Sequence, residues 1–246
     1  MALSKLENCG IMWYGYWVID IRPRERRMKV SVLIPAYNEE QTVGEVIKRV
    51  AAVDLEKEII VVDDCSTDKT LQILGALRQP GLVIISHDRN RGKGAAIRTA
   101  LAAASGDVLI IQDADLEYDP QDFHKLLKPF LEGKAKVVYG VRSLAGQKWH
   151  MRWGNRFLTM VANLLYGSKL QDMETCYKLV AREVIDDIEL CSDGFDIEAE
   201  ITAEILKRGC DIYQVPIWYS PRADKKLTPL DGLPTLWALI KLRFTD

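Results

Sequence analysis

Apolar runs alternate with segments of helical periodicity through the first half of the chain. Uninterrupted runs suit strands that are buried on both faces of a parallel sheet, because both rows of side chains must then be apolar. Between the first two runs, Val43, Val46, Ile47 and Val50 recur at the spacing of one helix face. The predicted strands cover residues 29–35, 58–62, 82–86 and 108–111. Strand–helix units in succession predict an α/β fold with a Rossmann-like, mostly parallel central sheet flanked by helices.

The fourth predicted strand ends in two carboxylates, Asp113 and Asp115, separated by one alanine. Ligands of parallel sheets bind beyond the carboxyl ends of the strands, where both side chains are expected. Two close carboxylates repel each other unless a cation lies beside them, and hard oxygen ligands favour Mg²⁺ or Mn²⁺. Glu117 can supply a third oxygen. The alternative is a solvated acidic loop.

Three other loops at the same predicted edge carry polar side chains. Tyr37, Asn38 and Glu39 follow the first strand, and Asp63 and Asp64 follow the second. Their acceptors suit the N–H groups of a base or the hydroxyls of a ribose. Asp64 has a simpler interpretation as a cap, and either Ser66 or Thr67 is expected to cap the helix that runs to Leu77.

The third loop, Arg91-Gly92-Lys93-Gly94, places cations at the start of a helix, which favours phosphate, although Lys93 can also be merely solvated. Together the loops indicate a cleft for a nucleoside diphosphate and a metal. The Gly-x-Gly-x-x-Gly fingerprint of dinucleotide binding is absent.

The second half adds a strand at 137–140, a helix at 196–207 and two apolar helices at 153–167 and 233–244. The helix at 153–167 is typical either of a core or of a bilayer surface, and the C-terminal helix can pack on the core, pair with another subunit or touch a membrane. Residues 144–152 are expected to form a mobile loop.

Composition narrows the classes of protein. The chain has 246 residues, 48% of them hydrophobic, and a formal net charge of −2, which argues against a dedicated nucleic-acid binder. Five cysteines without paired spacing predict neither a zinc site nor a disulfide framework, so a reducing compartment is expected. No apolar stretch reaches the roughly 18–20 residues of a membrane span.

The N-terminal segment differs from the rest. Residues 11–19 are aromatic and apolar, and residues 22–27 are mostly basic, an order unlike that of a secretory signal. The segment is either an interfacial anchor or an extension upstream of a natural start at Met28, and we favour the second. The expected domains are an N-terminal extension or interfacial segment at 1–28 and a single domain at 29–246.

Four motifs in this order and spacing resemble glycosyltransferase family 2, and within it the dolichol- or polyprenyl-phosphate mannose and glucose synthases. They are VSVLIPAYNEE at 30–40, IVVDDCSTDKT at 60–70, NRGKG at 90–94 and QDADLE at 112–117. The resemblance runs from about Lys29 to Phe244. It implies a GT-A fold with C-terminal amphipathic helices, an inverting mechanism and a nucleotide-sugar donor.

The resemblance also implies roles for individual residues. Asp113 and Asp115, with Glu117, are implied to hold the metal, and Asp115, Asp172 and Arg222 are candidate catalytic residues. The residues expected to bind the nucleotide sugar are Pro35, Tyr37, Asn38, Glu39, Asp64, Arg91, Lys93, Asp113, Arg142 and Lys226. The nucleotide-sugar half is expected at 29–118 and the acceptor half at 119–246.

Asp172 lies in a segment that resembles the Thr-Asp-Met-Glu-Thr-Cys-Tyr-Lys motif of this group and is placed near the acceptor. An acceptor hydroxyl needs a carboxylate base, whereas a lipid phosphate is already anionic and needs positive charge around it. Arg222, Lys225 and Lys226 form a candidate basic closing loop, with a solvated basic turn as the alternative.

The sequence is therefore interpreted as a metal-dependent (Mn²⁺ or Mg²⁺), inverting glycosyltransferase that moves a hexose from GDP-mannose or UDP-glucose to a polyprenyl phosphate. It is expected to contact the cytoplasmic face of a membrane peripherally, either alone or as a homo-oligomer. The rivals are transfer to a sugar hydroxyl with Asp172 or Glu198 as base, a nucleotidyltransferase, and a non-catalytic nucleotide-sugar-binding protein.

Overall fold

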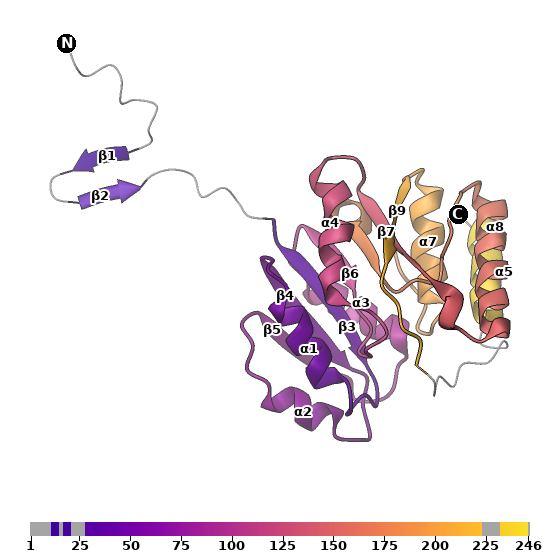
Figure 1. Ribbon diagram of the computed structural model, residues 1–246, viewed down its shortest axis with the longest axis horizontal. Helices are drawn as coiled ribbons and strands as arrows, with labels where there is room; N and C mark the ends of the chain where they lie inside the picture. The colour runs from indigo at the N-terminus through magenta and orange to yellow at the C-terminus, as the bar shows by residue number, and fades with distance from the viewer. Residues whose placement is uncertain (1–10, 15–16, 21–27, 223–231, 246) are drawn as a thin grey trace, which may run out of the picture.

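The computed structural model describes residues 11–14, 17–20, 28–222 and 232–245. Its largest element is a seven-stranded sheet with the strand order β5-β4-β3-β6-β8-β7-β9 (Figure 1). The strands are β3 (Val30–Ala36), β4 (Lys57–Asp63), β5 (Leu82–Ser86), β6 (Val108–Ile111), β7 (Val137–Arg142), β8 (Lys178–Ala181) and β9 (Ile212–Ile217). The predicted α/β class is confirmed.

All pairings in this sheet are parallel except the two made by β8, which runs antiparallel between β6 and β7. The sheet is thus mostly parallel, as predicted. Strand β8 was not predicted, because a run of four residues that opens with Lys178 lacks a clear apolar pattern.

Strand register brings the loops of the candidate site to one edge. Ala36 of β3 pairs with Asp63 of β4, and Leu33 of β3 pairs with Ile111 of β6. The polar loops that follow β3, β4 and β6 therefore open side by side. This adjacency follows from burial, since β3 and β6 are apolar on both faces and can lie only in the middle of the sheet.

Helices cover both faces of the sheet. They are α1 (Val43–Ala52), α2 (Thr70–Ala76), α3 (Lys93–Ala103), α4 (Phe123–Leu131), α5 (Trp149–Tyr166), α6 (Arg182–Ile185), α7 (Ile197–Lys207) and α8 (Gly232–Phe244), with 3-10 turns at Pro120–Asp122 and Leu144–Gly146. Ile97 of α3 and Ile201 of α7 line one small cavity with Leu33 and Leu109 of the sheet, which places both helices on one face. Helices α1 and α4 lie over the other face (Figure 1).

Helices α5, α7 and α8 form a second packing unit beside the sheet (Figure 1). Leu158 and Ala162 of α5, Ala199 of α7, and Ala238 and Leu239 of α8 make up its buried core. The predicted C-terminal helices are confirmed.

Two local expectations were wrong. Helix α5 begins at Trp149, so the expected loop at 144–152 is shortened to a 3-10 turn and a short connection. Neither Ser66 nor Thr67 caps α2; Asp68 Oδ1 accepts from the Thr70 backbone N–H at 2.9 Å, while Ser66 and the Thr67 backbone bond to Asn38.

The N-terminal segment contains two short strands, β1 (Ile11–Tyr14) and β2 (Trp17–Asp20), that pair in antiparallel fashion. Most of the expected extension at 1–28 lies outside the described residues. Among the helices that the structure describes, none is long and apolar enough to cross a membrane.

Candidate active site

Asp64, at the end of β4, organises the loop that precedes α3. Its Oδ1 lies 2.7 Å from His87 Nδ1 and accepts from the Arg91 backbone N–H at 2.9 Å, while Oδ2 accepts from the Gly92 backbone N–H at 2.7 Å. The side chain is buried. Asp64 therefore shapes the Arg91–Gly92 turn, and no motif in the sequence marked its partner His87.

Gly92 and Gly94 allow this turn to pack tightly on the segment before α7. A Cβ atom added at Gly92 would lie 2.3 Å from the Asp193 carbonyl oxygen, and one added at Gly94 would lie 2.2 Å from the Ser192 carbonyl oxygen. The backbone of Gly92 also has a φ of 95°. Only glycine fits at either position.

Asn38 joins the loops after β3 and β4. Its Oδ1 accepts from the Thr67 backbone N–H at 2.8 Å, its own backbone N–H donates to Ser66 Oγ at 2.9 Å, and it holds a φ of 53°. The adjacent Tyr37 is exposed, and Pro35 lies within β3. Of these three predicted donor-binding residues, Tyr37 presents the open aromatic surface.

Lys93 connects the predicted phosphate loop to the predicted metal carboxylate. Its Nζ lies 2.8 Å from Asp113 Oδ1 and 3.0 Å from Glu198 Oε1. Burial lowers the pKa of Lys93, but Asp113 and Glu198 outweigh it and raise the pKa well above its usual value. The alternative that Lys93 is merely solvated is therefore wrong.

Glu198 extends this chain of charges into the core. Its Oε2 contacts Lys178 Nζ, which is fully buried on β8. Lys178 also donates to the Thr175 carbonyl oxygen at 2.5 Å. Asp113, Lys93, Glu198 and Lys178 thus alternate in charge, which compensates the cost of burying each one.

Asp115 lies where negative charge is in excess. Burial, together with Asp113 and Glu117, raises the pKa of Asp115 from 3.8 to about 7. Arg222 lies beside it, with Nη2 at 3.5 Å from Asp115 Oδ2. A carboxylate in this setting is stabilised by an additional cation.

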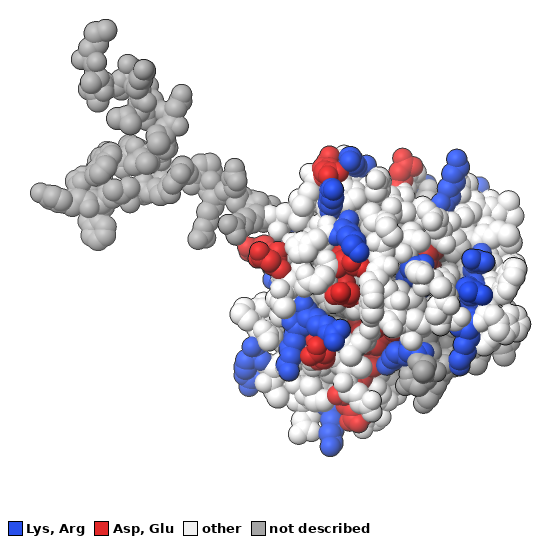
Figure 2. Space-filling model, in the orientation of Figure 1, with Lys and Arg blue, Asp and Glu red and all other residues white. Residues whose placement is uncertain are grey.

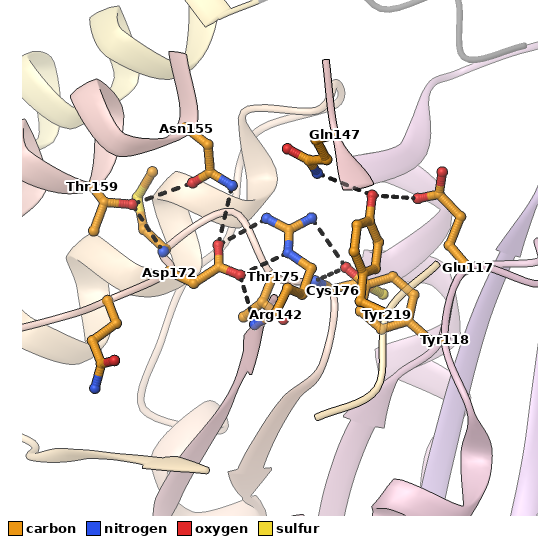
Figure 3. Close-up of polar contacts among 12 residues, drawn as sticks. Glu117, Tyr118, Arg142, Gln147, Asn155, Thr159, Asp172, Thr175, Cys176 and Tyr219 are labelled. Carbon is orange, nitrogen blue, oxygen red and sulfur yellow. Dashed lines mark hydrogen bonds and ion pairs between the residues drawn. The ribbon is translucent and has the colours of Figure 1, made fainter. Parts of the chain in front are cut away.

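Arg222 connects the segment after β9 to the loop after β3. Its Nη1 and Nη2 each lie 3.0 Å from one carboxylate oxygen of Glu39, on the loop after β3. Its backbone N–H donates to Glu117 Oε1 at 2.9 Å. Figure 3 shows the second bond to this carboxylate, in which Tyr219 Oη donates to Glu117 Oε2 at 3.1 Å. Glu39 and Glu117 therefore hold the segment 219–222 over Asp115.

Arg142 and Asp172 form a buried, bidentate ion pair (Figure 3). Arg142 Nε donates to Asp172 Oδ2 at 2.7 Å and Nη2 donates to Oδ1 at 2.8 Å; Asn155 Nδ2 adds a bond to Oδ1 at 3.3 Å. Burial raises the pKa of Asp172, but the bonds from Arg142 outweigh it and the net shift is downward.

Tyr118 and Tyr219 enclose the Arg142 guanidinium. Arg142 Nη1 donates to Tyr118 Oη at 3.3 Å, and its Cζ lies 5.1 Å from the Tyr219 ring centroid. Tyr118 Oη also accepts from the Cys176 backbone N–H at 3.1 Å. No feature of the sequence marked these two tyrosines.

The structure therefore groups the predicted residues into three parts. Glu39, Asp115, Glu117 and Arg222 meet at the sheet edge, with Asp113 beside Lys93. Arg142 and Asp172 form a separate buried pair, and Asn38 and Asp64 shape loops. Lys225 and Lys226 lie outside the described residues.

The fit of a divalent cation depends on the oxygen donors. Within the described residues no group of three or more His, Cys, Asp or Glu side chains is arranged to hold a metal. Both carboxylate oxygens of Glu117 accept bonds from residues 219–222, and its expected role as a third metal ligand stays a prediction. Asp113 and Asp115 remain hard oxygen donors, and the raised pKa of Asp115 reflects both its burial and the negative charges beside it, which fits Mg²⁺ or Mn²⁺.

Comparisons with known proteins identify the family of the chain. The family model described as glycosyl transferase family 2 matches residues 31–189. The chain is 32% identical over 213 residues to glycosyltransferase AglJ of Haloferax volcanii, covering 83% of this chain and 67% of that protein.

Two further relatives are named for lipid-phosphate acceptors. A dolichol-phosphate mannosyltransferase of Pyrococcus furiosus is 31% identical over 208 residues, covering 80% of this chain and 58% of the relative. An undecaprenyl-phosphate 4-deoxy-4-formamido-L-arabinose transferase of Serratia proteamaculans is 32% identical over 172 residues, covering 67% and 52%. The chain thus spans little more than half the length of either relative.

A similar solved structure is glucosyl-3-phosphoglycerate synthase from Mycobacterium tuberculosis in complex with Mn²⁺, UDP-glucose and phosphoglyceric acid. It aligns with a TM-score of 0.73 and 25% identity, covering 89% of this chain and 81% of that chain. The likeness agrees with the expected GT-A architecture. By fold, motif and family model, the chain belongs to glycosyl transferase family 2 and is a glycosyltransferase.

Proposed function

We propose that the chain transfers a hexose, with inversion, from a nucleoside diphosphate sugar to a polyprenyl phosphate at the cytoplasmic face of a membrane. In this proposal Asp113 and Asp115 hold Mn²⁺ or Mg²⁺. Residues 29–118 bind the nucleotide sugar, and residues 119–246 receive the acceptor. The names of two relatives, which specify dolichol phosphate and undecaprenyl phosphate, support the choice of acceptor.

The burial and ion pairing of Asp172 are the main support for a phosphate acceptor. A hydroxyl acceptor must lose a proton to a carboxylate base, whereas a phosphate acceptor is already anionic. Asp172 is only 1% exposed, and both of its oxygens are bonded to Arg142. Its lowered pKa also makes it a poor proton acceptor. In this proposal Asp172 is therefore the ion-pair partner of Arg142 and does not act as the base.

Glu198, the other base considered, is also engaged. Its two carboxylate oxygens face Lys93 and Lys178, and the side chain is buried. Both candidate bases are therefore paired with cations, which favours an acceptor that needs no base.

Cationic groups supply what a phosphate acceptor requires. The Arg222 guanidinium, fixed on Glu39, lies beside Asp115, and Lys93 lies beside Asp113. These cations can reduce the repulsion between an incoming phosphate and the donor diphosphate. A bound divalent cation would neutralise the leaving diphosphate.

The donor is proposed to be GDP-mannose or UDP-glucose. Tyr37 offers an exposed ring for the base. The backbone N–H groups of Gly94 and Ala95 at the N-terminus of α3 donate to the Asp193 carbonyl oxygen, so the Lys93 side chain is the group of this turn that we propose for the diphosphate. Structures of the Mycobacterium tuberculosis relative contain UDP together with Mn²⁺ or Mg²⁺.

A transfer assay tests the proposal. The chain is incubated with Mn²⁺, polyprenyl phosphate in detergent, and radiolabelled GDP-mannose or UDP-glucose in turn. We expect label from one donor to enter the organic phase. Label that stays in water while nucleotide is released would instead indicate a hydroxyl acceptor or hydrolysis, and nucleotide-sugar binding without turnover would indicate a non-catalytic protein.

Asp115→Asn tests the metal site in the same assay. We expect turnover to fall at least about 100-fold, since the variant loses one metal ligand and its charge. The exposed Asp54→Asn is the matched control and should retain full turnover. Undiminished wild-type turnover in the presence of a chelator would contradict a metal-dependent mechanism.

A further inference from the structure

Helix α5 exposes a continuous apolar stripe. Trp149, Trp153, Phe157, Met160 and Leu164 recur at intervals of three or four residues and are between 49% and 83% exposed. This spacing places them on one face of the helix. The opposite face is buried, with Leu158 and Ala162 in the core shared with α7 and α8. The stripe is therefore not part of that core.

Helix α8 carries a second stripe of the same kind. Leu233, Trp237, Ile240 and Phe244 are exposed at the same intervals, while Ala238 and Leu239 face the shared core. Tyr166 Oη of α5 donates to the Leu239 carbonyl oxygen at 2.8 Å, which fixes the two helices side by side. We call the two stripes together the α5–α8 face. Exposed apolar surfaces of this extent mark interaction sites.

The charged residues on these helices are all basic. Neither α5 nor α8 contains an aspartate or glutamate. Arg156 and Lys241 are exposed on the two helices. Figure 2 shows this composition along the right-hand edge, where α5 lies: blue and white atoms without red ones. The α5–α8 face thus combines apolar side chains, including three tryptophans, with positive charge.

Charge complementarity identifies the partner. If two copies of the chain paired through this face, their basic groups would approach each other with no acidic group on either helix to neutralise them. An anionic bilayer supplies the opposite charge. Its interfacial region is also where tryptophan rings are most stable, and a helix with an apolar face and basic flanks lies in that region.

The inner side of α5 contacts the candidate active site. Asn155 donates to Asp172, and Asp172 is the partner of Arg142. One helix therefore has site residues on its inner face and the exposed stripe on its outer face. An acceptor whose hydrocarbon tail stays in the bilayer would reach the site along this helix; this step rests on the proposed function.

We propose that the α5–α8 face is a membrane-binding surface that docks on the interfacial region of an anionic bilayer. The two helices lie parallel to the bilayer plane, with their tryptophans among the headgroups and with Arg156 and Lys241 beside lipid phosphates. The face holds the domain on the membrane without crossing it.

Vesicle co-sedimentation of the full chain, without donor or acceptor, tests this surface. The vesicles are phosphatidylcholine alone or a mixture with phosphatidylglycerol. We expect binding to the anionic vesicles, reduced by roughly tenfold or more in Trp153→Glu/Trp237→Glu. Arg156→Gln/Lys241→Gln should weaken binding to anionic vesicles and reduce its dependence on salt. Leu131→Glu, an equally exposed apolar position on α4, is the control and should bind like wild type.

Three outcomes would overturn the proposal. The first is unchanged vesicle binding by the Trp153→Glu/Trp237→Glu variant. The second is no vesicle binding by the wild type. The third is a dimer in solution that the same variant converts to a monomer, which would identify a self-association surface. Transfer to a short, water-soluble prenyl phosphate is measured in parallel. If the wild type does not use this acceptor, the result counts against the proposed function and leaves the membrane-binding proposal standing.

Discussion

Arg142 and Asp172, both buried, share two hydrogen bonds of 2.7 and 2.8 Å. Neither Arg142 nor Asp172 belongs to the four motifs at the sheet edge, and the two residues are 30 positions apart in the sequence. The bond from Asn155 ties α5 to the same carboxylate. The pair therefore links the end of β7 to the segment before β8 and to α5.

Asp172→Ala is expected to destabilise the domain. Removing one member of a buried ion pair leaves the other charge uncompensated, which costs about 3–5 kcal/mol. Arg142→Met/Asp172→Leu should recover most of this loss. Urea unfolding at pH 7 measures both, and Asp186→Ala, in an exposed pair with Arg182, should cost no more than about 1 kcal/mol. A catalytic base at this position would behave differently: Asp172→Asn would then abolish turnover at full stability.

Substitutions of Gly94 and Gly75 by alanine are expected to change the free energy of unfolding in opposite directions, although both glycines lie in helices. A Cβ atom at Gly94 lies 2.2 Å from the Ser192 carbonyl oxygen, so the 191–194 backbone must move, at a cost of about 1–3 kcal/mol. A Cβ atom at Gly75 meets nothing within 4 Å, and alanine there should gain about 0.5–1 kcal/mol. Thermal or urea unfolding compares the two variants. Equal effects would mean that the α3 turn does not pack on 191–194 in solution.

Arg222→Lys tests the bridge to Glu39. Lysine keeps the charge but cannot make the two parallel bonds of a guanidinium, so residues 219–222 lose their fixed position over Asp115. We expect kcat/KM in the transfer assay to fall by about tenfold, with a change of less than about 1 kcal/mol in unfolding free energy because Arg222 is partly exposed. Arg49→Lys, in the exposed pair with Glu45, is the control. Unchanged kinetics for Arg222→Lys would remove Arg222 from the site.

Glu58 is expected to make the free energy of unfolding depend on pH in the acid range. Burial raises the pKa of Glu58, but hydrogen bonds from Lys29, Ser31 and Ser105 outweigh it and lower the pKa from 4.5 to about 2. A carboxylate with a lowered pKa stabilises the fold fully above its ordinary value of 4.5, and that stabilisation is lost as the pH falls toward 2.

Unfolding of wild type and Glu58→Gln at several pH values measures this effect. The variant should be less stable by about 1–3 kcal/mol at pH 7, because it loses a charged acceptor of several hydrogen bonds. The difference should shrink between pH 4.5 and 2. The exposed Glu56→Gln is the control. A difference that stays constant with pH would show that Glu58 is not held as a carboxylate by these bonds.

Local patterns in the sequence were sufficient for most of the fold. Apolar runs with no alternation can form strands only where both faces are covered, so β3, β4 and β6 were predictable as the centre of a mostly parallel sheet. Helical spacing of apolar residues predicted α1, and the polar residues after each strand predicted the site edge, because parallel strands deliver their carboxyl ends together. The motif order predicted the family.

Tertiary structure alone decided which charged residues pair. Arg142 was expected to bind the nucleotide sugar and Asp172 to lie near the acceptor, yet the fold joins them to each other, because two opposite charges buried within reach are more stable paired than apart. It likewise turned Glu117 toward Tyr219 and Arg222, and Lys93 between Asp113 and Glu198. Such pairings depend on distances between segments far apart in the chain, and no local pattern records those distances.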